Sequence, residues 1–287
     1  MVKFKLKSFC KINLSLRVLR KLSSGYHKIQ SLVAFTDMHD TIVVSEKKGT
    51  RDSIIFSGQF TKGIDKKFNT ISKTLNLLRK MKQIRTKRFN LNIKKNIPPG
   101  SGLGGGSANA ATIINFLYKS KKIKLKKKLI YKLANQIGSD VPILLNKTTT
   151  LITGKRDKIV RYKKNFKLII LIVYPNVNCS TKRVYSKNKN FSRPKPDASY
   201  SIRSKSKLID FLKSEPNDLE ESTVKIYPIV RKIINIISNQ RGCYFSRLTG
   251  SGSACFGVFT SVNNAIIAQR FIKKKFPQYW CVVSKTI

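Results

Sequence analysis

Residues 97–112, IPPGSGLGGGSANAAT, constrain this chain most, because five of its 15 glycines lie between positions 100 and 106. Glycine is entropically costly in a folded chain and is kept where φ must be positive or where a group approaches the backbone closely. A bound anion meets both conditions, since successive N–H groups form a nest and a following helix adds its positive N-terminus. Residues 107–118, SANAATIINFLY, have the pattern of such a helix. The stretch therefore predicts a phosphate-binding loop.

Several known phosphate loops differ from this stretch. A Walker A loop ends in Gly-Lys-Ser/Thr, whereas Gly-Gly-Ser at 105–107 contains no lysine. The glycines at 100, 102 and 105 match G-x-G-x-x-G, but a dinucleotide site also needs an acid about twenty positions later, and the next acid is Asp140. Protein kinases are excluded because H-R-D and D-F-G are absent. A flexible linker is the remaining alternative, although a linker would not lead directly into an Ala-rich helix.

The composition is that of a globular protein large enough for two domains, with 287 residues of which 41% are hydrophobic. The first twenty residues lack the apolar core of a signal peptide. The aliphatic run at 168–173 is too short to cross a membrane. Five scattered cysteines and two histidines argue against a zinc site. We expect a cytoplasmic protein with reduced thiols, no metal site of its own and no membrane association.

The formal net charge is +46, which raises the possibility of nucleic-acid binding. The lysines are spread over the whole chain, and no RNA-binding signature accompanies them. We therefore expect no specific nucleic-acid partner. The 13 acidic residues leave few candidates for a general base.

Hydrophobic periodicity predicts an order of strands and helices. Residues 2–18 alternate apolar and polar side chains, with a bend or break expected near 8–10 and with Lys11, Asn13 and Ser15 sharing one face. Residues 153–167 are interpreted as a charged connector and residues 176–207 as a mobile or partly disordered loop. The other expected strands are 41–45, 89–93, 168–174, 244–248, 255–260 and 280–285, and the other expected helices are 69–81, 125–137, 228–238 and 263–276. From 168 onward the order β-α-β-β-α-β predicts a ferredoxin-like domain.

Three segments taken together resemble the signature motifs of the GHMP kinases, the small-molecule kinases that include galactokinase, homoserine kinase and mevalonate kinase. These segments are FCKINLSL at 9–16, PPGSGLGGGSANAAT at 98–112 and RLTGSGSACFGVF at 247–259. Two more stretches, SSGYHKIQSLVAFTDMHDTI at 23–42 and IGSDVPILL at 137–145, are similar to the members that act on a cytidine-diphosphate-linked methylerythritol. The resemblance runs nearly end to end and is weakest at 176–215.

The resemblance implies an α+β, two-domain GHMP kinase fold. Residues 1–155 would form the N-terminal ATP-binding domain, and residues 156–287 the C-terminal, ferredoxin-like substrate-binding domain. The implied activity is ATP-dependent phosphorylation of the substrate's 2-hydroxyl, with ATP and Mg²⁺ as the donor complex. The partner would be this small molecule, and the chain would be a monomer or a weak homodimer.

The resemblance also implies two catalytic residues. Asp140 would accept the hydroxyl proton, and Lys11 would keep that carboxylate ionised and stabilise the reacting oxygens. A helix N-cap is the alternative role of Asp140, because it follows Gly138 and precedes Val-Pro. Phe9-Cys10 stands where the family usually has Pro-Ala before the lysine.

The remaining implied residues divide between the two substrates. Tyr26 and His27 would hold the cytosine with Tyr185 as a second ring, Asn13 and Thr181 would contact the methylerythritol, and the Gly250 turn would close the site. Partial burial is the alternative for the two tyrosines, and a tight hairpin is the alternative for the turn. The implied ATP-binding set is Asn69, Lys95, Pro98, Pro99, Gly100, Ser101, Gly102, Leu103, Gly104, Gly105, Gly106, Ser107 and Ala108, and the implied substrate-binding set is Asn13, Tyr26, His27, Thr181, Tyr185, Gly250, Ser251 and Gly252.

Two rival functions remain. Another GHMP kinase, such as homoserine or mevalonate kinase, would explain the glycine stretch but not Gly-Tyr-His at 25–27. A catalytically idle ATP-binding or RNA-associated protein would not need both Lys11 and Asp140.

Overall fold

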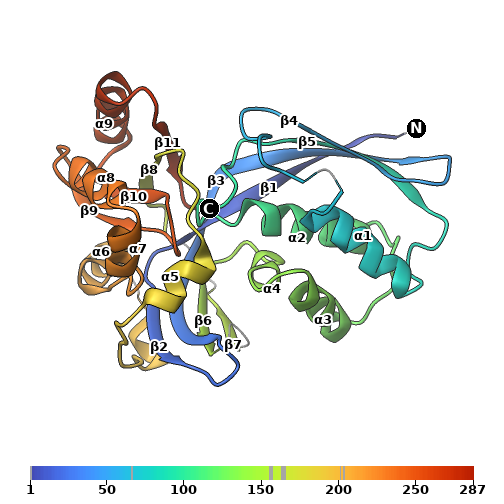
Figure 1. Cartoon of the computed structure of the whole chain (residues 1–287), viewed down its shortest axis with the longest axis horizontal. Helices are drawn as coiled ribbons and strands as arrows, with labels where there is room; N and C mark the ends of the chain where they lie inside the picture. The colour runs from blue at the N-terminus through green and yellow to red at the C-terminus, as the bar shows by residue number, and fades with distance from the viewer. Residues whose placement is uncertain (1, 66, 155–157, 163–165, 201, 203) are drawn as a thin grey trace. The chain divides into compact units, whose positions relative to one another are not determined.

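Figure 1 shows the computed structural model of the chain, which describes residues 2–65, 67–154, 158–162, 166–200, 202 and 204–287. These residues form two compact units. The first unit takes its described residues from the chain up to Cys10, Met38–Pro99 and Gly104–Lys147, and the second from Lys11–Asp37, Gly100–Leu103 and Thr148–Ile287. The boundary predicted at 155/156 lies outside the described residues. The division into residues 1–155 and 156–287 stays a prediction.

The first unit joins a small sheet to a group of helices. Strand β5 (Arg88–Lys94) pairs in parallel with β4 (Ser53–Ser57) and antiparallel with residues 41–47 of β3 (His27–Lys47). Strand β1 (Phe4–Asn13) also pairs with β3. The helices lie together on one side of these strands (Figure 1) and are α1 (Thr70–Lys80), α2 (Gly105–Lys119), α3 (Lys127–Ile137) and α4 (Val141–Leu144). The helices predicted at 69–81, 107–118 and 125–137 are therefore confirmed to within two residues at their ends.

The second unit contains the other half of β3 and a separate sheet. Residues 27–33 of β3 pair antiparallel with β2 (Arg17–Lys21) and with β6 (Thr150–Gly154). The separate sheet has the order β11-β8-β10-β9, and every neighbouring pair is antiparallel. Its strands are β8 (Ile169–Tyr174), β9 (Cys243–Leu248), β10 (Cys255–Phe259) and β11 (Trp280–Lys285), and the helices of this unit are α5 (Thr181–Lys187), α6 (Lys205–Ser214), α7 (Glu220–Ile226), α8 (Ile229–Ser238) and α9 (Val262–Lys275). This order is the ferredoxin-like arrangement predicted from the sequence.

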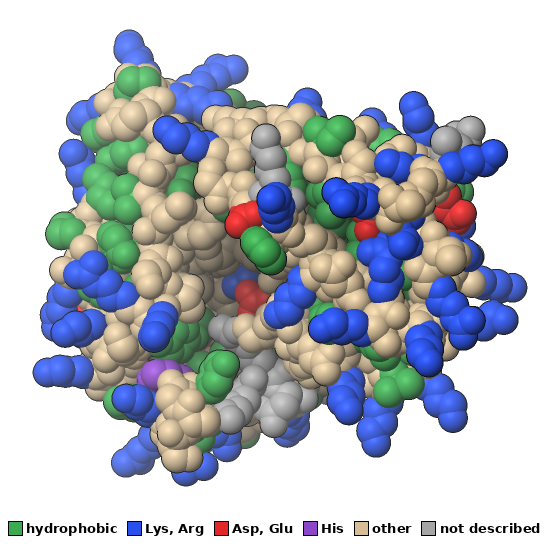
Figure 2. All heavy atoms as spheres, turned by 45° about the vertical axis from the view of Figure 1, so that its right-hand side comes forward, with side chains coloured by type: hydrophobic (Ala, Val, Ile, Leu, Met, Phe, Trp, Pro, Cys, Tyr) green, Lys and Arg blue, Asp and Glu red, His purple; other side chains and the backbone are tan. Residues whose placement is uncertain are grey.

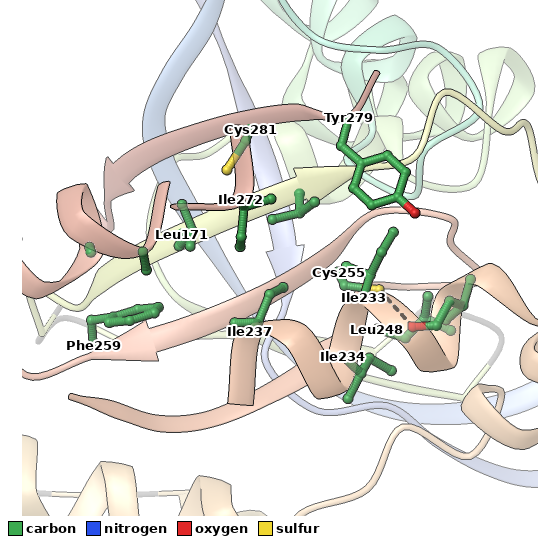
Figure 3. Close-up of a cluster of buried hydrophobic side chains, with 14 residues drawn as sticks. Leu171, Ile233, Ile234, Ile237, Leu248, Cys255, Phe259, Ile272, Tyr279 and Cys281 are labelled. Carbon is green, nitrogen blue, oxygen red and sulfur yellow. Dashed lines mark hydrogen bonds between the residues drawn. The ribbon is translucent and has the colours of Figure 1, made fainter. Parts of the chain in front are cut away.

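An apolar cluster packs the ferredoxin-like sheet against its helices. Figure 3 shows that β8, β10, α8 and α9 all contribute side chains to it, among them Leu171, Phe259, Ile237 and Ile272. Each of these four side chains is at most 1% exposed. Such burial stabilises the fold by about 1.5–3 kcal/mol for each large side chain. The cluster therefore fixes β9 and β10, the two strands that carry the Gly250 turn.

Three local predictions were wrong. Within the connector predicted at 153–167, residues 153–154 end strand β6 and residues 158–161 form β7 (Lys158–Arg161), which pairs antiparallel with β6. Strand β1 is continuous through residues 8–10, and the break falls at 14–16, where the Leu14 and Ser15 N–H groups both donate to the Leu32 carbonyl. Residues 181–187 form α5 rather than an irregular loop, since Ser180 caps the helix and Val184 is buried.

Lysine and arginine side chains are spread across the visible face of the molecule rather than gathered on one part of it (Figure 2). This distribution agrees with their even spacing in the sequence. Among the described helices, none combines the length and the apolar character that a membrane crossing requires.

Candidate active site

The glycine stretch has the backbone geometry of an anion nest. Gly100, Gly102 and Gly104 have φ values of 63°, 85° and 72°, in the left-handed region that favours glycine. Gly104 is also the N-cap of α2 and provides no side-chain cap to the first N–H groups of that helix. Those groups have no acceptor within the helix, so a helix start of this kind favours a phosphate.

The glycines of this stretch are required for different reasons. A Cβ on Gly102 would lie 2.2 Å from the Thr249 carbonyl oxygen, and a Cβ on Gly105 would lie 2.8 Å from Ile97 Cγ2, so packing alone excludes a side chain at both. At Gly106 the nearest atom to an added Cβ is Thr70 Oγ1, at 3.6 Å, and φ is not positive. Gly106 is therefore the glycine whose lack of a side chain is best explained by a ligand.

Several other residues that were predicted to bind ATP have buried side chains. Ser101, Leu103 and Ala108 are at most 2% exposed, and Pro98 is also buried, whereas Pro99 and Ser107 are partly exposed. A nest binds anions through main-chain N–H groups, so buried side chains are compatible with this role. The structure leaves the ATP contacts of these residues as predictions.

Asn69 and Lys95 both make local contacts in the first unit. Asn69 Oδ1 accepts hydrogen bonds at 3.0 Å from the Ile71 and Ser72 N–H groups, and it thereby caps α1. Lys95 is only 3% exposed and forms an ion pair with Asp40 and a 3.0 Å hydrogen bond to Asn109 Oδ1. Both residues support the elements that flank the glycine stretch, and their contact with ATP stays a prediction.

Asp40 was not predicted from the sequence as a site residue, yet its carboxylate binds several groups beside the glycine stretch. Asp40 Oδ1 accepts from the Asn96 and Ile97 N–H groups at 2.8 and 2.9 Å, directly before the glycine stretch. Asp40 Oδ2 also accepts from Asn109 Nδ2 in α2 at 3.0 Å. Asp40 lies in the quoted stretch at 23–42, and the scarcity of acids in this chain could have drawn attention to it.

Asp140 stands at the N-cap position of α4 in the first unit. Its carbonyl accepts from the Ile143 and Leu144 N–H groups at 3.2 Å, but its carboxylate makes no capping hydrogen bond. The side chain is partly exposed. Asp140 is thus an N-cap by backbone position only, which leaves its carboxylate compatible with the predicted catalytic role. Lys11 belongs to the second unit, so the predicted pairing of Lys11 with Asp140 stays a prediction.

Lys11 and Asn13 lie on one face of β1, as their spacing predicts, whereas Ser15, expected on the same face, lies beyond the end of the strand. Lys11 is 7% exposed, and its Nζ donates to Asn13 Oδ1. Asn13 Nδ2 donates to Ser31 Oγ at 2.8 Å, and the Asn13 N–H donates to Thr249 Oγ1 at 3.0 Å. These bonds hold the Lys11 ammonium in a fixed, mostly buried position, which is what electrostatic stabilisation of a reaction requires.

The Gly250 turn connects β9 to β10 and closes around Lys11. Gly250 and Gly252 have φ values of 59° and 84°. A Cβ on Gly250 would lie 3.3 Å from Asn13 Oδ1, which is a tight contact, and 3.5 Å from Lys11 Nζ, which is an ordinary one. Ser251 Oγ and Thr181 Oγ1 share a hydrogen bond of 2.9 Å. The hairpin alternative is correct as a description of the backbone, and the turn also brings together Lys11, Asn13, Ser251 and Thr181.

Cys179 lies beside this turn, and its Sγ would be 3.6 Å from a Cβ on Gly252. Burial raises the pKa of the Cys179 thiol to about 11. The group therefore stays protonated near neutral pH and is a poor nucleophile.

His27 and Tyr185 form an aromatic pair in the second unit. Their ring centroids are 5.0 Å apart, with an interplanar angle of 40°. Burial, and secondly the charge of Lys21, lowers the pKa of His27 below its usual 6.5, so its imidazole is neutral at pH 7. A neutral imidazole offers one donor and one acceptor. Tyr26 is 69% exposed, which leaves its predicted packing against a base untested.

Comparison with known proteins identifies similar chains. Residues 69–147 match "GHMP kinases N terminal domain", and residues 203–278 match "GHMP kinases C terminal". The 4-diphosphocytidyl-2-C-methyl-D-erythritol kinase of Pelagibacter ubique is 39% identical over 286 residues, which cover 99% of both chains. The enzyme of the same name from Wolbachia pipientis wMel is 33% identical and covers 96% of this chain and 97% of its own.

Two solved structures share the fold. A 4-(cytidine 5'-diphospho)-2C-methyl-D-erythritol kinase superposes with a TM-score of 0.79 at 21% identity and 99% coverage of both chains. A homoserine kinase from Cytophaga hutchinsonii superposes with a TM-score of 0.69 at 15% identity, covering 99% of this chain and 94% of its own. At these identities the superpositions establish the two-domain GHMP kinase fold alone.

Proposed function

Because this chain belongs to the GHMP kinases and is related over its whole length to their 4-diphosphocytidyl-2-C-methyl-D-erythritol kinases, we propose that it phosphorylates that substrate. ATP would donate its γ-phosphoryl group to the 2-hydroxyl, giving the 2-phosphate and ADP in the methylerythritol phosphate route to isoprenoid precursors. The observation that carries this proposal is the buried Lys11 ammonium held between Asn13 and the Gly250 turn.

Phosphoryl transfer depends mostly on positioning and charge stabilisation, and the residues described above can supply both. The α2 N-terminus and the left-handed glycines would bind the triphosphate. Lys11 would stabilise the negative charge of the reacting oxygens, and Asp140 would accept the proton of the hydroxyl.

Mg²⁺ would neutralise phosphate charge during this reaction. No group of three or more His, Cys, Asp or Glu side chains suited to a metal occurs among the described residues. The hydroxyl of Ser107 in the first turn of α2 is the candidate protein contact, to a phosphate oxygen or to the metal. One hydroxyl group suits a metal ion that would take most of its other ligands from the nucleotide phosphates and water.

The proposal is tested with purified protein, ATP and three alternative acceptors: the cytidine-linked methylerythritol, homoserine and mevalonate. We expect phosphorylation of the first only. Phosphorylation of homoserine or mevalonate would instead indicate that the chain is another kind of GHMP kinase. ATP binding without transfer to any acceptor would support the idle ATP-binding alternative.

Replacement of Gly106 by alanine tests the phosphate role of the glycine stretch. Alanine is favourable within a helix, and the added Cβ has no protein neighbour closer than 3.6 Å, so thermal stability should not fall. A methyl group at a backbone–phosphate contact should raise the KM for ATP about tenfold or more, since hydrogen bonds to charged groups contribute about 1.5–3 kcal/mol.

Gly257→Ala is the control, because Gly257 lies in β10, outside the glycine stretch, and its Cβ would meet Ile237 Cγ2 at 2.4 Å. This variant should lower the melting temperature and leave the KM for ATP unchanged. An unchanged KM for ATP in Gly106→Ala would remove Gly106 from the phosphate site.

Replacement of His27 by alanine tests the cytosine site. A cytidine nucleotide should inhibit the enzyme more strongly than its uridine counterpart, because uracil exchanges a donor and an acceptor and leaves the site's groups unpaired at about 1–3 kcal/mol each. His27→Ala should weaken inhibition by the cytidine nucleotide and narrow this gap, with little change in the KM for ATP.

His39→Ala, in the other histidine of the chain, is the control, since His39 lies beside Phe9 in the first unit. Equal inhibition by both nucleotides, or a gap that survives His27→Ala, would assign cytosine recognition to other residues.

A further inference from the structure

The segment between α6 and α7 lies along the chain that connects β1 to β2. The Leu16 N–H donates to the Pro216 carbonyl at 2.9 Å, and the Asp218 N–H donates to the Leu16 carbonyl at 2.9 Å. Leu16 and Asn217 thereby form an isolated parallel bridge. These backbone bonds fix Asn217 in the second unit beside Leu16, which follows Lys11 and Asn13 by a few residues along the chain.

The side-chain amide of Asn217 makes three hydrogen bonds. Asn217 is 7% exposed. Its Nδ2 donates to the Leu248 carbonyl at 2.8 Å and to the Gly250 carbonyl at 2.9 Å, while its Oδ1 accepts from the Leu219 N–H at 3.1 Å. One amide thus links the end of β9, the start of the Gly250 turn and the residues before α7.

The Gly250 turn is held from two directions. Thr249 Oγ1 accepts from the Asn13 N–H, and Asn217 binds the carbonyls on either side of Thr249. A Cβ built on Gly250 would contact Lys11 Nζ and Asn13 Oδ1. The bonds to Asn217 therefore limit how far the turn can move toward or away from the Lys11 ammonium.

We propose that Asn217 is a positioning residue for phosphoryl transfer, acting through the Gly250 turn on Lys11 and Asn13. This inference rests on the proposed kinase function. Loss of the two N–H donors would leave two buried carbonyls without these bonds, and the turn would then relax to satisfy them. A displacement near 1 Å at a catalytic site lowers a rate about 100-fold.

Two variants remove these donors in different ways. Asn217→Asp keeps the shape and an acceptor for the Leu219 N–H, but it places a carboxylate oxygen against two carbonyls. Asn217→Ser removes the amide without adding a charge and keeps a short acceptor oxygen. We expect kcat to fall about 10- to 100-fold in both variants at pH 8. We also expect faster amide hydrogen exchange at residues 249–254.

The pH dependence separates positioning from loss of structure. The Leu248 and Gly250 carbonyls raise the pKa of the carboxyl introduced by Asn217→Asp, because its neutral form can donate to a carbonyl, and the neighbouring Asp218 and Glu220 carboxylates act in the same direction. The Lys11 ammonium and the Arg247 guanidinium act in the opposite direction, each from a position fixed by its own hydrogen bonds. The ratio of this variant's kcat to the wild-type kcat should therefore increase as the pH is lowered from 8 to 6. The ratio for Asn217→Ser should stay constant.

Gln269→Glu is the matched control. Gln269 in α9 donates through Nε2 to the Cys281 carbonyl of β11 at 2.9 Å, so the same amide-to-carboxyl change removes a comparable bond elsewhere in the second unit. This control should keep its kcat and the exchange rates of residues 249–254.

Hydrogen exchange is measured without substrate, so it tests the turn even if the wild-type protein fails to phosphorylate the cytidine-linked substrate. Unchanged exchange at 249–254 in both Asn217 variants would overturn the proposal. So would wild-type kcat in both variants, or a kcat ratio for Asn217→Asp that does not change with pH.

Discussion

Asp140→Asn should lower turnover about 10²–10⁴-fold, because an amide cannot accept the proton that a general base removes from the substrate hydroxyl. The substitution preserves the shape of the side chain. The Asp140 carboxylate makes no capping bond to α4, so loss of a helix cap would not explain the fall in turnover. ATP should still bind, and single-turnover rates with saturating ATP would isolate the loss in the chemical step.

The N-cap interpretation of Asp140 predicts the opposite result. Asparagine is as good an N-cap as aspartate, so a residue with only that role would tolerate the change with near-normal turnover. Asp218→Asn is a useful comparison, because the Asp218 carboxylate accepts from the Val18 N–H at 2.7 Å and from Ser192 Oγ at 2.9 Å. This variant should lose stability while it keeps most of its turnover. Near-normal turnover in Asp140→Asn would reduce Asp140 to a cap.

The regular elements were predictable where local pattern and tertiary structure agree. The helix at α1 has both a cap signal at Asn69 and an apolar face that includes Leu75 and Leu78, and the structure shows the capping box and the burial of that face. Strand β8 is a continuous aliphatic run that is buried as a central strand of its sheet. The ferredoxin-like order followed from such clear elements.

Elements that depend on distant partners were not predictable. Strand β7 is rich in charge, and it forms because β6 provides the neighbouring strand. In helix α5 only Val184 is buried, so its sequence has no apolar periodicity from which a helix could be predicted. In both cases tertiary contacts override a weak local signal.

The candidate site shows the same limit more sharply. The shared face of Lys11 and Asn13 follows from the period of a strand. The bond from Asn13 to Thr249 spans 236 positions, and the bonds from Asn217 to the Gly250 turn span 31 and 33. No local pattern encodes such contacts. The resemblance to GHMP kinases identified the Gly250 turn, but it gave no reason to consider Asn217.

Lys11→Met should also lower turnover, by about 10²–10³-fold, since it removes a fixed positive charge from the reacting oxygens. Methionine keeps much of the buried aliphatic volume of Lys11, so the protein should stay folded. Lys122→Met is the matched control, because it removes the same charge from a pair with Glu46 in the first unit. Turnover should not change in that control.

The double variant Lys11→Met with Asp140→Asn asks whether the two residues act together. They belong to different units, and each is expected to act in the same phosphoryl-transfer step, Asp140 on the hydroxyl proton and Lys11 on the reacting oxygens. When two groups stabilise one transition state, removing both costs much less than the product of the two single losses. The double variant should therefore be slower than the slower single variant by about tenfold at most. Independent actions would instead multiply to about 10⁴–10⁷-fold. All three variants are measured in one assay at saturating ATP. A double-variant loss equal to the product of the two single losses would contradict a coupled Lys11–Asp140 pair. A loss close to that of the slower single variant would show that both residues stabilise one transition state.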